Sequence, residues 1–189
     1  MLKKFSDKIC LGTAQFGGNY GISNSKRTLS KKESLNIIET AKKNGISFFD
    51  TAKAYGESEK ILGISGLKNS KIITKIKIDI KAQNIEKEII DSVNEILKKL
   101  RVKKIYAILI HNPVCLMGSK SKKIYEVLIK LKKEGKIKKI GISAYSPMEM
   151  SKIINKFKID IVSFPLNPFD NRLIKLGLIK ILKRKKIEV

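Results

Sequence analysis

Short runs of β-branched and other apolar residues alternate along this chain with longer segments of helical period. This alternation limits the fold more than any other feature of the sequence. Most of the runs are continuously apolar, which is typical of strands that helices cover on both faces of a parallel sheet. The runs that we predict to be strands are Ile9–Thr13, Ile46–Thr51, Lys71–Ile76, Ile105–His111, Ile137–Ser143, Ile159–Phe164 and Ile187–Val189.

Helix signals lie between these runs. Ser30 and Glu33 form the Ser-x-x-Glu pattern of a capping box, and Gly45 stands where a C-terminal glycine is expected. Apolar residues recur at spacings of three and four from Ile85 to Leu100, which predicts one amphipathic helix. We predict further helices in Ile124–Glu134 before Gly135, after Ser146 and Pro147, and from about Leu173 to Lys186.

The strand–helix unit recurs about every thirty residues, the size of a βαβ crossover. An open doubly wound sheet is the competing fold, but its first strand is usually followed by a G-x-G-x-x-G turn. The turn from Gly12 to Gly18 lacks that spacing. We therefore predict an α/β protein, a parallel (β/α)8 TIM-type barrel in a single domain over residues 1–189. The barrel is incomplete, with about six βα units and the start of the seventh strand.

The chain carries a formal net charge of +24, from 41 Lys and Arg against 17 Asp and Glu. This charge is almost all lysine and is spread over every predicted helix. Basic charge alone gives only non-specific, salt-sensitive attachment to nucleic acid. We therefore expect no specific nucleic-acid partner.

The cysteines, Cys10 and Cys115, lie far apart and lack the spacing of a metal site, so we expect neither a disulfide framework nor a bound metal. The N-terminus has no apolar signal segment, and no run approaches the ~20 apolar residues of a membrane-spanning helix. We expect a cytoplasmic protein without a membrane partner.

Polar residues stand where predicted strands end, and in a parallel barrel the carboxyl ends of all strands meet on one face. Taken singly, an Asp there caps a helix, a Lys is a solvated charge and a Tyr packs. Their joint occurrence at successive strand ends favours a catalytic site. The residues are Asp50, Lys75, His111, Ser143 and Ser163, with Tyr55 on the loop after Asp50.

The segment from Phe48 to Glu59, Phe-Phe-Asp-Thr-Ala-Lys-Ala-Tyr-Gly-Glu-Ser-Glu, resembles the signature of the aldo/keto reductases. Later blocks of that family are matched in order by Ile72–Lys75, Leu109–Pro113, Gly135–Ser143 and Pro165–Asp170, so the resemblance covers nearly the whole chain. It implies an oxidoreductase that uses NADP or NAD to reduce a small aldehyde or ketone.

Carbonyl reduction needs a hydride at carbon and a proton at oxygen, and so a positioned acid. Tyr55 would be that acid, although a free phenol has a pKa of about 10. The ammonium of Lys75 would stabilise the phenolate, Asp50 would hold Lys75 charged, and His111 would orient the substrate oxygen. The resemblance implies the same catalytic role for each of these residues.

We expect the cofactor to contact Thr13, Asp50, Ser143 and Ser163. Members of the family commonly hold the nicotinamide carboxamide with Ser-Asn after the fifth strand and a Gln on the sixth. This chain has Ser143-Ala144 and Ser163 at those places, so one of the family's donor types remains. Cofactor orientation is therefore the part of the site in which the chain departs from the family.

The chain ends at Val189, inside the predicted seventh strand. The resemblance places the aromatic that stacks on the nicotinamide, and the residues that bind the cofactor phosphates, beyond that point. We therefore expect a truncated barrel that lacks the C-terminal cofactor-binding strands. Its unpaired apolar edges would favour self-association.

Two other interpretations remain open. The chain is a non-catalytic remnant or a nucleotide-sensing binding protein of the same fold, as the missing strands and altered donors suggest. Alternatively, Lys75 is the Schiff-base lysine of a barrel lyase. Lys75 and Lys77 lie on one strand face, and a neighbouring positive charge lowers the pKa of a lysine, which frees its amine to react.

Overall fold

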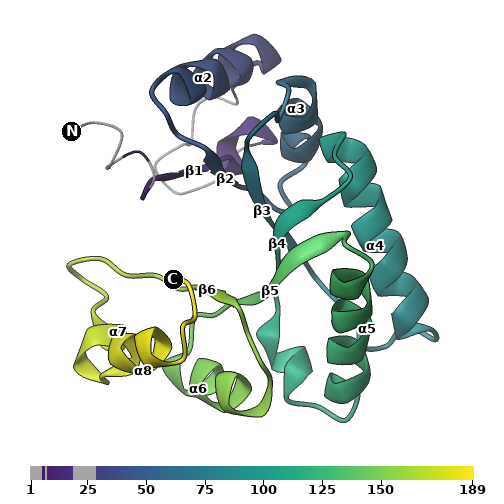
Figure 1. Cartoon of the computed structure of the whole chain (residues 1–189), viewed down its shortest axis with the longest axis vertical. Coiled ribbons are helices and arrows are strands. Elements are labelled where there is room, and N and C mark those ends of the chain that lie inside the picture. Colours follow the sequence, from purple (N-terminus) through teal and green to yellow (C-terminus); the bar gives the residue numbers. More distant parts are fainter. Residues whose placement is uncertain (1–5, 7, 19–28) are drawn as a thin grey trace. The chain divides into compact units, whose positions relative to one another are not determined.

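The computed structural model describes residues 6, 8–18 and 29–189 (Figure 1). A six-stranded sheet carries its strands in chain order, and helices alternate with them as the sequence predicts. The strands are β1 (Cys10–Gly12), β2 (Phe48–Asp50), β3 (Lys71–Ile76), β4 (Ile105–Ile110), β5 (Ile137–Ser143) and β6 (Ile161–Ser163). The helices are η1 (Ala14–Phe16), α2 (Lys31–Lys43), α3 (Ser58–Ile64), α4 (Ile85–Leu100), η3 (Pro113–Leu116), α5 (Ser121–Lys133), α6 (Pro147–Lys156), α7 (Arg172–Lys175) and α8 (Leu178–Arg184).

Contacts divide the chain into two compact units. The first unit comprises Met1–Lys75 and Val93–Tyr106, and the second comprises Ile76–Ser92 and Ala107–Val189. The single domain over residues 1–189 stays a prediction.

In the first unit, β1 pairs with β2 and β2 pairs with β3, each in parallel. Gly12 lies opposite Asp50, which in turn lies opposite Ile73. This register brings the carboxyl ends of β1 and β2 side by side, and the side chains of Phe49 and Ile72 in these strands are buried.

Both predicted ends of α2 are confirmed. The Ser30 hydroxyl accepts a hydrogen bond from the Glu33 amide at 3.2 Å, and the Ser30 amide donates to the Glu33 carboxylate at 2.9 Å. After the helix, Gly45 adopts φ +82°, a left-handed conformation that glycine reaches without strain. The helix therefore begins and ends where the sequence signals place it.

Helix α3 buries an acidic residue, Glu59, which is 1% exposed. One of its carboxyl oxygens accepts a hydrogen bond from the Thr74 hydroxyl at 2.7 Å, and Oε2 has no hydrogen-bond partner among the described residues. Burial is the largest cause that raises the pKa of Glu59 above its ordinary value of 4.5. The folded protein thus binds this proton more tightly than the unfolded chain, and the stabilisation is complete below pH 4.5 and lost as pH rises through the folded pKa.

We expect Glu59→Gln to stabilise the protein at about pH 7 by about 1 kcal/mol, because the amide keeps the Thr74 bond and removes a buried charge. At about pH 4 the variant and the wild type should unfold at similar denaturant concentrations. Urea unfolding at both pH values measures this difference.

Glu95 on α4 provides a control, because its pKa shift, and so the expected effect of its replacement by Gln on stability, has the opposite sign. Hydrogen bonds from Lys53 and Lys99 lower the pKa of Glu95 to about 2. Its stabilisation is therefore present above the ordinary pKa of 4.5 and is lost as pH falls toward 2. Glu95→Gln should destabilise the protein near neutrality, and equal signs for the two variants would contradict this account of Glu59.

In the second unit, β5 and β6 pair in parallel, with Ser143 opposite Ser163. The start of the predicted seventh strand is confirmed, since Glu188 forms a parallel bridge with Ile161. The Val162 amide donates to the Glu188 carbonyl at 2.8 Å, and Figure 1 shows the C-terminus beside β6.

Helix starts in this unit also follow the sequence. The Ser146 side chain caps α6 by accepting a hydrogen bond from the Glu149 amide, and Pro147 is in the first turn, as predicted. The single helix predicted from about Leu173 to Lys186 is wrong. Gly177 adopts φ +66° there, which separates α7 from α8.

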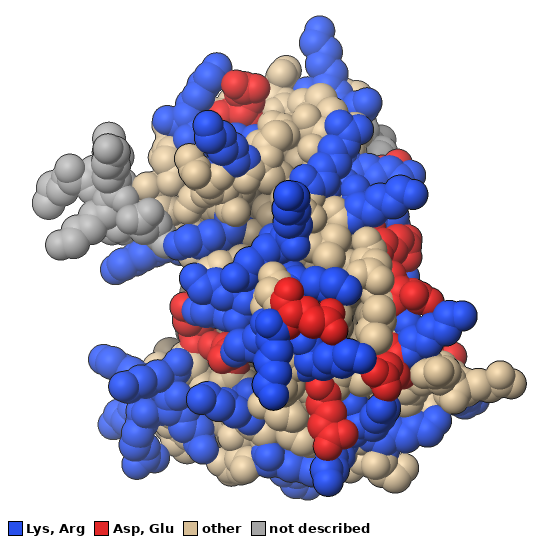
Figure 2. Space-filling model, turned by 45° about the vertical axis from the view of Figure 1, so that its right-hand side comes forward, with Lys and Arg blue, Asp and Glu red and all other residues tan. Residues whose placement is uncertain are grey.

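Lysine and arginine side chains cover much of the visible face, with acidic groups between them (Figure 2). They are not gathered on one element, which agrees with the spread of charge seen in the sequence. No helix among the described residues is long and apolar enough to span a bilayer.

Candidate active site

An ion pair between a buried lysine and a half-buried aspartate joins the ends of β2 and β3. The Lys75 ammonium donates to both carboxylate oxygens of Asp50 at 2.6 Å and to the Thr51 carbonyl at 3.1 Å. The side chain of Lys75 is 5% exposed and that of Asp50 is 29% exposed. Because neighbouring parallel strands carry these residues, the sheet itself fixes the geometry of the pair.

Tyr55 lies against this pair. The Lys75 ammonium is 3.4 Å from the phenol oxygen and 5.0 Å from the centre of the ring. The turn that carries Tyr55 is tied to its surroundings, since the Tyr55 amide donates to the Ala52 carbonyl at 2.9 Å and the Lys53 amide donates to the Lys75 carbonyl at 3.1 Å. A cation within reach of a phenol stabilises its deprotonated form.

His111 belongs to the second unit and directly follows β4, at the strand end where the sequence places it. Its amide donates to the Ile76 carbonyl at 2.8 Å. The side-chain amide of Asn112 bonds the Ile78 amide and carbonyl at 3.1 and 3.2 Å. The structure thus brings Asp50, Tyr55 and Lys75 together in the first unit, and the four-residue site stays a prediction.

The residues predicted to hold the cofactor have different surroundings. Thr13 is fully buried; its hydroxyl donates to the Asp50 carbonyl at 2.9 Å and lies 2.6 Å from the Ser58 hydroxyl. Ser143 is 5% exposed, whereas Ser163, its neighbour across β5 and β6, is exposed. Ser143 and Ser163 can therefore present hydroxyls at adjacent strand ends, while the Thr13 hydroxyl already bonds within the protein.

Cys10 of β1 is also part of the electrostatic surroundings of the pair. Cys10 is exposed as a residue, but desolvation of its thiol, followed by the charge of Asp50, raises the pKa of Cys10 to about 12, and the charge of Lys75 opposes this shift. Sequence analysis did not connect Cys10 with the site, because its link to Asp50 arises only from the pairing of β1 with β2. No group of His, Cys, Asp and Glu in the described part of the chain could hold a metal ion.

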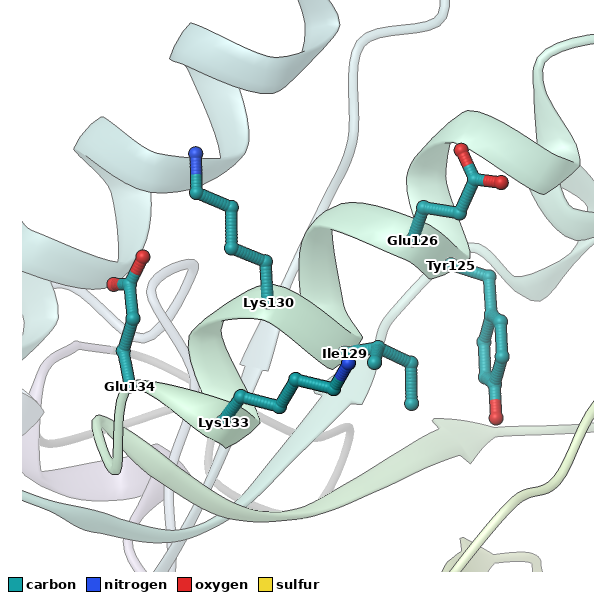
Figure 3. Close-up of a pocket in the computed structure, with 6 residues that line it drawn as sticks. All are labelled: Tyr125, Glu126, Ile129, Lys130, Lys133 and Glu134. Carbon is teal, nitrogen blue, oxygen red and sulfur yellow. The ribbon is translucent and has the colours of Figure 1, made fainter.

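One hollow in the surface of the second unit lies along α5 (Figure 3). The Tyr125 hydroxyl there donates to the Lys158 carbonyl at 2.9 Å, and Lys130 pairs with Glu86 at 3.1 Å. None of the predicted site residues lines it.

Another hollow lies in the second unit, beside the loop that follows His111. The side chains of Ile80, Val114 and Met117 line it and are exposed. The Lys120 ammonium, at its rim, donates to the Ile80 carbonyl at 2.7 Å. An apolar ligand group would find contacts here.

These features define an α/β protein of parallel strands with a buried Asp–Lys pair beside a tyrosine at the strand ends. The model described as "Aldo/keto reductase family" matches residues 8–189. The chain therefore belongs to the aldo/keto reductase family, as the sequence resemblance predicts.

Similar proteins agree with this assignment. The aldo-keto reductase YhdN of Bacillus subtilis is 28% identical over 180 residues, which are 89% of this chain and 52% of that protein. The chain thus spans about half the length of this curated relative.

Solved structures confirm the fold. A protein of Pseudomonas aeruginosa classed as an aldo-keto reductase superimposes with a TM-score of 0.78 at 23% identity, over 95% of this chain and 70% of its own. The holo form of aldo-keto reductase AKR11C1 from Bacillus halodurans gives 0.75 at 17% identity, over 95% and 59%. The predicted fold class, an incomplete (β/α)8 barrel, is therefore confirmed.

Proposed function

We propose that this chain is an oxidoreductase that transfers a hydride between a nicotinamide cofactor, NADP or NAD, and an aldehyde or ketone. The observation that carries the proposal is the Lys75 ammonium, held by Asp50 at 2.6 Å and lying 3.4 Å from the Tyr55 hydroxyl. Membership of the aldo/keto reductase family supports the same reaction class.

Each residue of the proposed active site has a defined task in the reaction. Tyr55 gives its proton to the carbonyl oxygen as the oxygen gains charge, and Lys75 stabilises the phenolate that remains. Asp50 keeps the ammonium charged and fixed, so little reorganisation is needed during the reaction. His111 orients the substrate oxygen, and the nicotinamide, when bound, supplies the hydride.

Binding follows from the residues around these groups. Ser143 and Ser163 hold the nicotinamide carboxamide, since their strands pair in register and bring the residues side by side. Thr13 supports the loop next to Asp50 through its hydrogen bonds. The free thiols Cys10 and Cys115 are compatible with a reducing compartment, and we place the protein in the cytoplasm.

Tyr55→Phe should lower kcat for NADPH-dependent reduction at least ~100-fold, because it removes the acid. The loss of nicotinamide absorbance with a panel of aldehydes and ketones measures the rate. Tyr145→Phe is the matched control, since Tyr145 is 61% exposed in the second unit. Wild-type turnover by Tyr55→Phe would contradict the assignment of Tyr55 as the acid.

A second candidate is a nucleotide-binding protein without turnover, or a remnant. The observation that favours it is the altered set of carboxamide donors, Ser143-Ala144 and Ser163, where the family commonly has Ser-Asn and Gln. Calorimetric titration with NADPH separates the candidates. Binding without reduction of any carbonyl supports a nucleotide-binding protein, and the absence of both supports a remnant.

A further inference from the structure

Ser58, the first residue of α3, is fully buried next to hydroxyl groups from distant parts of the first unit. Its oxygen lies 2.6 Å from the Thr13 hydroxyl and 3.0 Å from the Thr51 hydroxyl. The Thr13 hydroxyl in turn donates to the Asp50 carbonyl at 2.9 Å.

A single direction of donation fits all of these distances. Thr51 donates to Ser58, Ser58 donates to Thr13, and Thr13 donates to the Asp50 carbonyl. The Ser58 proton is shared between the Thr13 hydroxyl at 2.6 Å and the Thr13 carbonyl at 3.0 Å. We refer to Thr51, Ser58 and Thr13 as the hydroxyl chain. A buried chain in which every hydroxyl proton is donated is rigid, and the loss of one member leaves another unpaired.

The hydroxyl chain begins and ends on the residues that hold the ammonium. The Asp50 carboxylate and the Thr51 carbonyl bind Lys75, while the Asp50 carbonyl and the Thr51 hydroxyl bind the chain. The positions of the ammonium and of Ser58 are thus set by the same adjacent residues.

Ser58 also closes the turn that carries Tyr55. The Ser58 amide donates to the Tyr55 carbonyl at 3.1 Å. The other end of the turn is fixed by the bond from the Tyr55 amide to the Ala52 carbonyl at 2.9 Å. A shift of Ser58 therefore moves the backbone of Tyr55 relative to Lys75.

We propose that Ser58 is a positioning residue for Tyr55, acting through the hydroxyl chain to keep the phenol oxygen next to the Lys75 ammonium. This inference rests on the proposed role of Tyr55 as the acid and gives a role to Ser58, a residue of the Phe48–Glu59 segment that had none.

Ser58→Ala should separate the phenol from the ammonium and raise the titration midpoint of Tyr55, because the cation that stabilises the phenolate moves away. NMR of protein with isotope-labelled tyrosine measures this midpoint, and Tyr55→Phe assigns the signal. The matched control is Ser34→Ala, since Ser34 is equally buried in the same unit and donates to the Ser30 carbonyl at 3.0 Å on α2. Ser34→Ala should leave the Tyr55 midpoint unchanged.

The titration needs no turnover, so it decides the inference even where the reductase proposal fails. In an active chain, Ser58→Ala should also lower kcat about tenfold while KM for the carbonyl changes less than about twofold. Thr51→Val, which removes the first donor with little change in volume, should shift the midpoint in the same direction and serves if Ser58→Ala does not fold. An unchanged Tyr55 midpoint in a folded variant, or an equal shift in Ser34→Ala, overturns the inference.

Discussion

Lys75→Met is expected to cost about 3 kcal/mol of unfolding free energy, because the variant leaves the Asp50 carboxylate partly buried without its counter-charge. It should also reduce kcat at least ~100-fold, since no cation remains to stabilise the phenolate of Tyr55. Urea unfolding and the NADPH assay measure the two effects separately. The stability effect requires no assumption about function.

The double variant Asp50→Asn with Lys75→Met tests the cause. Replacing both charges should recover much of the lost stability but none of the lost activity. Lys77→Met is the control for removing a lysine, since Lys77 is exposed and lies just after β3. If Lys75→Met is as stable as Lys77→Met, the ion pair contributes nothing measurable and the physical basis of the site is lost.

The same pair bears on the lyase interpretation of Lys75. A Schiff-base lysine must present a free amine to a carbonyl, whereas both oxygens of Asp50 accept hydrogen bonds from Lys75. Lys77 is exposed, while Lys75 is 4% exposed. The surroundings of Lys75 therefore suit a fixed ammonium better than a nucleophile.

The sequence predicts the bounds of a strand correctly where the whole apolar run pairs with a neighbouring strand. Strands β3 and β5 match their predicted bounds at both ends, β4 ends one residue before the predicted His111, and β1, β2 and β6 are shorter than predicted at both ends. An apolar run indicates that its residues are buried, but the backbone hydrogen bonds of the sheet extend only where a neighbouring strand is in register. Helix α3 was missed, because Ser58–Ile64 is too short to repeat an apolar stripe.

The candidate site also contains residues that the sequence predicts and one, Ser58, whose role it does not predict. The strand-end rule for parallel sheets places Asp50 and Lys75 side by side, and family resemblance adds Tyr55. No sequence pattern indicates the role of Ser58, since its bond to Thr13 joins residues 45 positions apart. Such a contact depends on how the loop packs against the strand, and neither the periodicity of apolar residues nor the spacing of motif residues predicts that packing.

Gly17→Ala is expected to disrupt the Tyr55 turn. A Cβ atom at Gly17 would lie 1.6 Å from the Tyr55 carbonyl oxygen and 2.5 Å from its carbon, which are backbone atoms that cannot turn aside as a flexible side chain can. A Cβ atom at Gly56, which adopts φ +53°, would in turn clash with the Gly17 carbonyl. We expect a loss of about 2 kcal/mol in stability and a fall in kcat of about 100-fold, the effect of misplacing a catalytic group by about 1 Å.

Gly12→Ala is the matched control for this substitution, because a Cβ atom there would meet nothing within 4 Å. Its unfolding free energy should stay within about 0.5 kcal/mol of the wild type. Tyrosine NMR then reports whether Gly17→Ala has moved the phenol, since the Tyr55 midpoint should rise toward that of a free phenol as Lys75 is left behind. If Gly17→Ala keeps both the midpoint and the rate of the wild type, backbone contact with Gly17 does not hold Tyr55, and the turn relies on the hydroxyl chain alone.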